Sequence, residues 1–139
     1  MTPDGILESV VYADDLDAAE RFYSHVLELP VVSREPGRHV FFRSGASMFL
    51  VFRPDVTASR VVLPGNVAVP AHGARGPGHV AFRVHEAELP GWRDRLKAEG
   101  VPVEAEVAWP RGGRSLYFRD PAGNSIELAT PALWGMTEE

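Results

Sequence analysis

Apolar residues recur along this chain with two different periods, and the longer period comes first. Over residues 15–29 (DLDAAERFYSHVLEL) one stripe of helical period holds Leu16, Ala19, Phe22, Tyr23, Val26 and Leu27. Asp14 or Asp15 can cap this stretch, because a short carboxylate accepts hydrogen bonds from the free amides of a first turn. The pattern predicts an amphipathic helix that begins near residue 15.

Short runs rich in β-branched and aromatic residues flank this helix and predict strands. They are residues 6–13 before the helix and residues 30–34, 39–43 and 47–52 after it. The second half repeats the order with a strand at 78–84, a helix at 89–100 and strands at 101–109, 115–119 and 124–130. Pro90 near the start of that helix and Gly100 at its end follow the usual asymmetry of these two residues.

The two halves align as copies of one unit. Residues 7–10 fall on 78–81, 41–43 on 117–119 and 47–50 on 125–128, so Glu8 corresponds to His79 and Phe49 to Glu127. We expect one domain over residues 1–139, with a first module at about 5–54, a connector at about 55–76 and a second module at about 77–130. The Pro- and Gly-rich connector predicts either a linker that lets the modules dock or a functional flap.

Alternation within the strands places three polar side chains on unexpected faces. Glu127 lies between Ile126 and Leu128, and since successive strand residues point to opposite faces, it points away from the helix side. His79 and Glu8 alternate onto the equivalent face of their own strands. A carboxylate in such a place is costly unless it is paired or bound to a cation. Two carboxylates and an imidazole that converge predict a divalent-metal site.

Composition narrows the class of protein further. The 139 residues carry a net charge of −5, are 45% apolar and include no cysteine. The acidic balance argues against a nucleic-acid partner, and no stretch is long and apolar enough for a membrane span. No secretory signal is visible, and the lack of cysteine excludes disulfides and thiolate chemistry. We therefore expect a cytoplasmic protein whose ligand is a small molecule.

Three stretches in order resemble the vicinal oxygen chelate superfamily of glyoxalase, bleomycin-resistance and extradiol dioxygenase proteins. They are DLDAAERFYSHVLEL, GHVAFRV and YFRDPAGNSIEL, which is the most specific of the three. The resemblance implies an α+β fold in which two βαβββ modules form a U-shaped mixed sheet around a central cavity. It also implies a metal site and a homodimer.

The family's four metal-ligand positions fall on Glu8, Phe49, His79 and Glu127. Phe49 cannot bind a metal, so the four-ligand glyoxalase pattern is absent, and Glu8 replaces a common histidine. The resemblance implies that Glu8, His79 and Glu127 hold a divalent ion, Mn, Fe, Ni, Zn or Mg. In the family the metal acts as a Lewis acid on a substrate with vicinal oxygens. A metal-bound water, Glu8 or His72 is the candidate base.

Side chains that share the proposed inner face are candidates for substrate binding. They are Tyr12, Phe49, Arg83, Tyr117 and Arg119. Arg83 and Arg119 could instead pair with Glu8 or Glu127 and make the cluster a structural one. A glyoxalase-like lyase or a dioxygenase-like metalloenzyme is favoured, with transferase and isomerase chemistry left open. The alternatives are a metal-free binding protein of the bleomycin-resistance kind and a structural or regulatory dimer.

Overall fold

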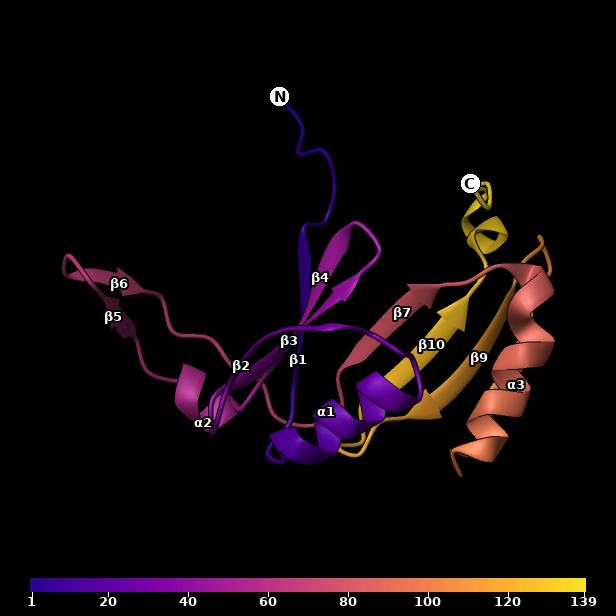
Figure 1. Cartoon of the computed structure of the whole chain (residues 1–139). Coiled ribbons are helices and arrows are strands. Elements are labelled where there is room, and N and C mark those ends of the chain that lie inside the picture. Colours follow the sequence, from indigo (N-terminus) through magenta and orange to yellow (C-terminus); the bar gives the residue numbers. More distant parts are fainter. The chain divides into compact units, whose positions relative to one another are not determined.

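The computed structural model describes all 139 residues and divides into two compact units, Met1–Gly78 and His79–Glu139. Each unit contains the βαβββ order that the sequence predicts, so the predicted α+β fold is confirmed (Figure 1). The first unit contains β1 (Glu8–Tyr12), α1 (Leu16–His25), β2 (Val31–Glu35), β3 (His39–Ser44), β4 (Ser47–Phe52), α2 (Pro54–Thr57), β5 (Val61–Leu63) and β6 (Val67–Val69). The second contains β7 (His79–Arg83), η1 (Glu86–Glu88), α3 (Leu89–Ala98), β8 (Ala105–Ala108), β9 (Arg114–Arg119), β10 (Ser125–Ala129) and η2 (Pro131–Trp134).

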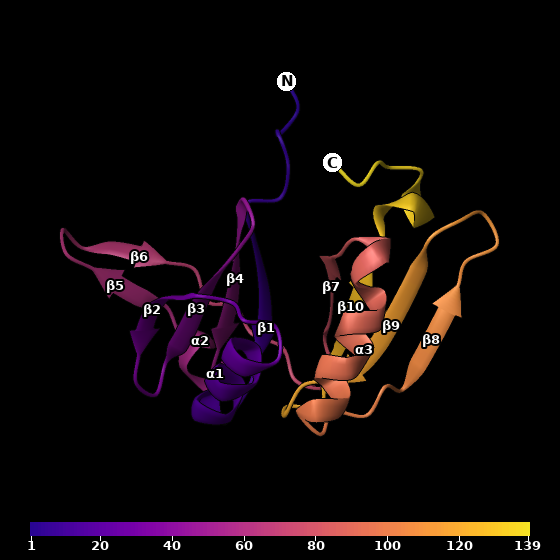
Figure 2. The ribbon, with the colours of Figure 1, turned by 45° about the vertical axis from the view of Figure 1, so that its right-hand side comes forward.

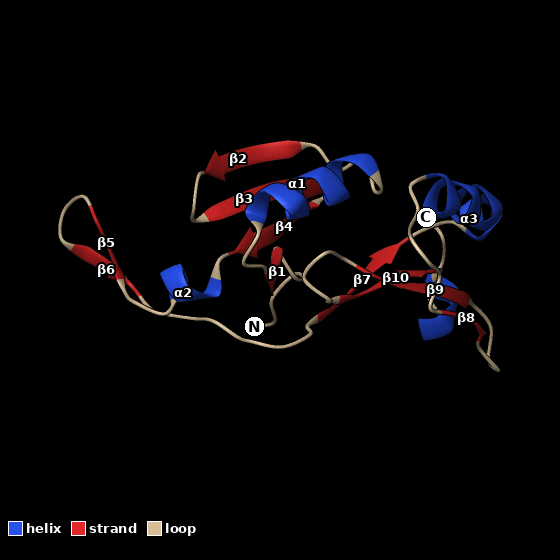
Figure 3. Ribbon diagram, turned by 90° about the horizontal axis from the view of Figure 1, so that it is seen from below, coloured by secondary structure: helices blue, strands red, loops and turns tan.

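The first unit is a four-stranded sheet in the order β1-β4-β3-β2 with α1 across one face (Figure 3). Asp15 caps α1 by accepting a 2.9 Å hydrogen bond from the amide of Ala18. The core forms where α1 meets the sheet: Tyr23 is fully buried, with ring centroids 4.8 Å from Phe49 and 5.6 Å from Phe42. The opposite face of the sheet is therefore the open one.

The second unit repeats this arrangement, with strand order β7-β10-β9-β8 and α3 lying along one face (Figure 2). Leu89 and Leu96 of α3 are buried against an apolar sheet face. That face carries the fully buried side chains Leu116, Phe118, Ile126 and Leu128. In both units the helix takes the apolar face, which leaves the other face free to carry polar chemistry.

The predicted connector contains regular structure. Helix α2 follows β4 directly, and β5 and β6 pair as an antiparallel hairpin that projects from the first unit (Figure 1). The hairpin exposes Val62, Leu63, Val67 and Val69. No helix of the chain combines the length and the apolar character needed to cross a bilayer.

Candidate functional site

Glu127 lies on the open face of the second sheet, although it is only 7% exposed. In the register of β10 it is opposite Ala81 of β7 on one side and Tyr117 of β9 on the other. Its neighbours Ile126 and Leu128 point to the α3 side, where they are fully buried. Strand alternation thus places a buried carboxylate in the middle of the open face.

A chain of hydrogen bonds holds one oxygen of this carboxylate. The Ser115 hydroxyl, fully buried on β9, donates to Glu127 Oε2 over 2.6 Å. The Trp109 indole Nε1–H donates in turn to Ser115 Oγ over 2.8 Å. A carboxylate that accepts such bonds remains stable as an anion inside a protein.

His79 lies beside the other oxygen, and its orientation is fixed from behind. Its Nδ1 is 2.9 Å from the backbone carbonyl of Ser125, which can only accept, so Nδ1 carries a proton. The remaining ring nitrogen, Nε2, faces Glu127 Oε1 at 3.2 Å. A carbonyl behind the imidazole is the arrangement that orients histidines which bind metals through Nε2.

The His79–Glu127 pair fits a divalent cation. In a neutral ring, Nε2 and the carboxylate oxygen both present lone pairs, so a proton or a cation must lie near both. Two ligands of one ion with bond lengths of about 2.1 Å are about 3.0–3.4 Å apart, which matches the Nε2–Oε1 separation. Neither unit holds a group of three His, Asp or Glu side chains placed for a metal, so this pair needs a further ligand.

A cavity of about 470 Å³ opens beside the pair. His79, Glu127 and Tyr117 form its polar part, and Trp109, Leu133 and Trp134 line it with apolar surface. The Tyr117 ring stacks on His79 with centroids 6.3 Å apart. Burial, followed by the charge of Glu127 and hydrogen bonding to it, raises the pKa of Tyr117, so its hydroxyl stays protonated at neutral pH.

The predicted anion-binding arginines have protein partners, and neither contacts Glu127. Arg119 makes a two-point ion pair with Glu104 at 2.7 and 3.1 Å, which raises the pKa of Arg119 and lowers that of Glu104. Arg83 donates to the backbone carbonyl of Glu139 over 3.0 Å. The cation that lines the cavity is Arg111.

The first unit carries Glu8 and Tyr12, which are predicted residues of the open face, and His72, a predicted residue of the connector. Glu8 begins β1 and is opposite Met48, just as His79 begins β7 and is opposite Ser125. The Tyr12 hydroxyl lies 2.5 Å from His72 Nδ1, and burial raises the pKa of this tyrosine. The Tyr12 hydroxyl and His72 Nδ1 share a hydrogen bond, and the His72 ring also packs edge-on against Phe52.

The predicted equivalence of Phe49 and Glu127 is wrong by one residue. Phe49 is opposite Ser9 in β1 and is 1% exposed, on the face that α1 covers. The register of β4 makes Leu50 the counterpart of Glu127, because Leu50 is two residues beyond the partner of Glu8. Phe49 is consequently a core residue of the first unit. Leu50 cannot bind a metal either, so the incomplete ligand set does not depend on this correction.

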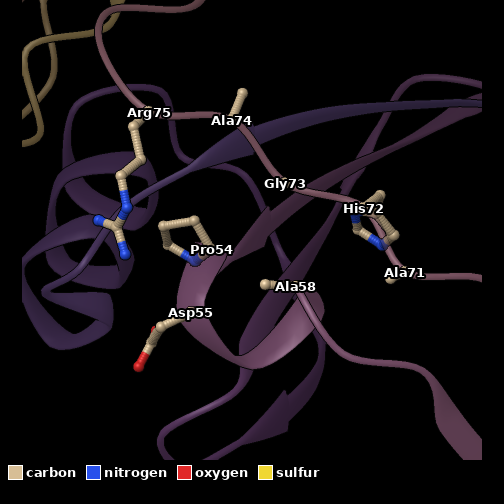
Figure 4. A pocket seen from close by; sticks show the side chains of 8 residues that line it. All are labelled: Pro54, Asp55, Ala58, Ala71, His72, Gly73, Ala74 and Arg75. Carbon is tan, nitrogen blue, oxygen red and sulfur yellow. The ribbon is translucent and has the colours of Figure 1, made fainter.

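A second hollow in the first unit, of about 420 Å³, lies between α2 and residues 71–75 (Figure 4). Figure 4 shows Asp55 and Arg75 on one side of it and the His72 ring on the other. Arg53 donates to Asp55 over 2.7 Å, and Arg75 lies 3.6 Å from Asp14. These charges are paired, so the hollow has less to offer a ligand than the cavity beside Glu127.

Sequence reasoning missed Ser115, Trp109 and Arg111 as members of the site. Ser115 had a signal, because it alternates with Tyr117 along β9 onto the face of Glu127. Trp109 and Arg111 lie in the turn between β8 and β9, where no periodicity predicts the direction of a side chain.

Comparison with known proteins identifies the family and the fold. Residues 5–128 match the sequence profile of the Glyoxalase/Bleomycin resistance protein/Dioxygenase superfamily. Among solved structures, lactoylglutathione lyase from Agrobacterium tumefaciens has a TM-score of 0.90 and 43% identity. That likeness covers 98% of this chain and 100% of the other.

More distant similarities extend to two further proteins. Metallothiol transferase FosB of Shouchella clausii (strain KSM-K16) is 28% identical over 93% of this chain and 82% of its own. The fosfomycin resistance protein FosX from Mesorhizobium loti has a TM-score of 0.64 at 22% identity, covering 93% of each chain, which speaks for the fold alone.

Proposed function

Because this chain belongs to the glyoxalase/bleomycin resistance protein/dioxygenase superfamily, we propose that it is a divalent-metal-dependent enzyme acting on a small molecule with vicinal oxygens. The observation that carries the proposal is the approach of His79 Nε2 to Glu127 Oε1 at 3.2 Å, with Nδ1 held by the Ser125 carbonyl. Both groups are oriented from behind, and both turn a lone pair toward the same place. Such a pair is suited to Mn, Fe, Ni, Zn or Mg.

The proposal includes Glu8 as the third metal ligand, because the repeat makes it the counterpart of His79. It has the same strand position and sheet register in β1 that His79 has in β7. A divalent ion held by these residues would act as a Lewis acid on two neighbouring substrate oxygens. With Glu8 the ligand set has two carboxylates and one imidazole. Such a set favours harder ions more than a set with two imidazoles does.

The remaining cavity residues would bind and orient the substrate. Tyr117, whose hydroxyl hydrogen-bonds to Glu127, would present its hydroxyl oxygen to the substrate as an acceptor, and Arg111 offers a charge for an anionic group. Trp109 and Trp134 supply apolar walls for the rest of the molecule. Of the predicted arginines, Arg119 has the weaker case, because Glu104 already occupies its guanidinium.

Proton transfer is assigned to Glu8 or His72. A His72 ring that donates from Nδ1–H to the Tyr12 hydroxyl would have Nε2 free to take up a proton. A lyase reaction is the first to assay, because the structure of 43% identity is that of a lactoylglutathione lyase. Transferase and dioxygenase reactions follow, since the relatives and the superfamily include both. A homodimer, which the resemblance implies, is measured by light scattering.

The test is metal binding by protein purified without a metal-affinity tag or chelator. We expect near-stoichiometric metal, or uptake of added Mn²⁺ or Ni²⁺ in calorimetry, which His79→Ala and Glu127→Ala abolish. His85→Ala is the matched control, because His85 also faces a carboxylate, Glu138, at 3.6 Å in the same unit. Wild-type protein that neither contains metal nor takes up either ion would overturn the proposal.

The apolar cavity wall favours a second candidate, a metal-free binding protein. If His79 carries a second proton, its contact with Glu127 is an ion pair that shapes the cavity without a metal. Trp109 and Trp134 would then stack on an aromatic ligand. Ligand affinity that is unchanged by EDTA and lowered by Trp134→Ala would support this candidate over the enzyme.

A further inference from the structure

We propose that Ser115 and Trp109 are positioning residues that make Glu127 a one-oxygen ligand; the inference rests on the metal-dependent function proposed above. Ser115 donates to Oε2 over 2.6 Å, whereas Oε1 faces His79 at 3.2 Å. The two carboxylate oxygens therefore have separate tasks. Oε2 accepts from Ser115, and Oε1 faces His79 Nε2, where a cation would lie; Tyr117 also hydrogen-bonds to this carboxylate.

The Trp109 indole determines the direction of the Ser115 hydroxyl. A serine hydroxyl can donate one hydrogen bond and accept others, so by itself it could turn either way. Because Trp109 Nε1–H can only donate, its 2.8 Å bond occupies a lone pair of Ser115 Oγ. The serine proton then lies toward Glu127, where the acceptor is charged and the bond is strong.

Burial makes this arrangement rigid. Ser115 is fully buried and Glu127 is 7% exposed, so bulk water has little access to the bond between them. The backbone of Ser115 lies in β9, paired with Val107 and Ala129, which fixes the position of its hydroxyl. Partners of this kind commonly change metal affinity by about 10–100-fold when they are removed.

Trp109 also lines the cavity, so the same indole would contact both the ligand and the support of Glu127. A substrate packed against its ring would help to hold Nε1–H on Ser115. Substrate binding and metal binding should thus strengthen each other, and Trp109→Phe should weaken that coupling while keeping an aromatic wall.

The experiment measures Mn²⁺ affinity by calorimetry in Ser115→Ala and Trp109→Phe. We expect Ser115→Ala to bind Mn²⁺ about 10–100-fold more weakly and Trp109→Phe a few-fold more weakly. Ser115→Thr, which keeps the hydroxyl, should restore the affinity if its methyl group is accommodated. Trp134→Phe is the matched control, because Trp134 lines the same cavity outside this chain of bonds. Affinities of Ser115→Ala and Trp109→Phe both within twofold of wild type would overturn the inference.

A second readout needs no metal. The chain has three tryptophans, Trp92, Trp109 and Trp134, whose indole N–H signals are assigned by single Trp→Phe substitutions. In metal-free protein, Glu127→Gln should shift the Trp109 indole signal and leave the other two in place. An unmoved Trp109 signal would overturn the inference whether or not metal binds. If Glu127→Gln shifts the Trp109 signal but the wild-type protein binds no Mn²⁺, the proposed function fails and the hydrogen-bond chain stands.

Discussion

Gly113 packs directly on the backbone of Leu133: a Cβ atom built on Gly113 would lie 2.4 Å from the Leu133 nitrogen. Leu133 belongs to η2, the short helix that contributes Leu133 and Trp134 to the cavity. The absence of a side chain at Gly113 therefore lets η2 close this part of the cavity wall.

We predict that Gly113→Ala displaces η2 and exposes the cavity. The adjacent Gly112 is the matched control, since both residues have positive φ (+111° and +85°) but a Cβ on Gly112 meets nothing within 4 Å. Gly112→Ala should cost about 1–3 kcal/mol for the backbone alone. Gly113→Ala should cost more and also change Trp134 fluorescence. Equal unfolding free energies for the two variants would contradict the steric argument.

The turn between β9 and β10 depends on one buried carboxylate. Asp120 Oδ1 accepts from the amides of Ala122 and Asn124 at 3.0 and 2.8 Å, and Oδ2 accepts from Asn124 Nδ2 at 2.9 Å. Asp120→Ala leaves these donors without their acceptor, at about 1–3 kcal/mol for each buried group. We predict a loss of several kcal/mol in urea unfolding. Glu104→Ala, at an exposed carboxylate, should change the midpoint little.

Phe49 provides a test of the corrected register. It is 1% exposed between Tyr23 and the sheet, so Phe49→Ala should lower the free energy of unfolding by about 3–5 kcal/mol. Phe41 is the control on the open face, where its ring stacks on His39 at 3.8 Å. Phe41→Ala should cost less, because that face is only partly covered. A larger loss for Phe41→Ala than for Phe49→Ala would indicate that Phe49 lies on the open face, against the corrected register.

His39 should make the stability of the protein depend on pH. It is 7% exposed, and burial, together with the adjacent Arg38 charge, lowers its pKa, while Glu35 at 3.7 Å opposes this weakly. Arg38 donates to His39 Nδ1 over 2.9 Å, which requires a neutral ring with the proton on Nε2, toward Ser33.

The sign follows from which state takes up the proton first. The unfolded chain, with an ordinary histidine pKa of about 6.5, protonates before the folded state does, so stability falls as pH drops below that value. We predict that the free energy of unfolding, measured by urea titration from pH 7.5 to 5, decreases less in His39→Gln than in wild type. Phe41→Leu, which removes the stacked ring and keeps His39, is the matched control, and its curve should keep the wild-type dependence on pH.

Strand alternation and the repeat were sufficient to predict both units and to place Glu127, His79 and Glu8 on the open faces. They failed at Phe49, because aligning two apolar runs such as SMFLVF and NSIELA leaves their register uncertain by one residue. The register of β4 becomes known only from the structure, in which Glu8 pairs with Met48. The pairing of Arg119 with Glu104 was not predicted for another reason, since Glu104 lies outside any strand and no pattern connects the two residues.

Tight pairing on both sides of the β9–β10 turn has a consequence for changes in chain length. Asp120 and Asn124 close this turn, and Ser125 pairs with Arg119 directly beyond it. One inserted residue that shifted β10 by a single position would carry Glu127 beneath α3 and bring a hydrocarbon side chain to the open face. The chain would keep every residue of its site and lose the site itself. The number of residues in this turn is therefore as much a determinant of the chemistry as the identity of Glu127.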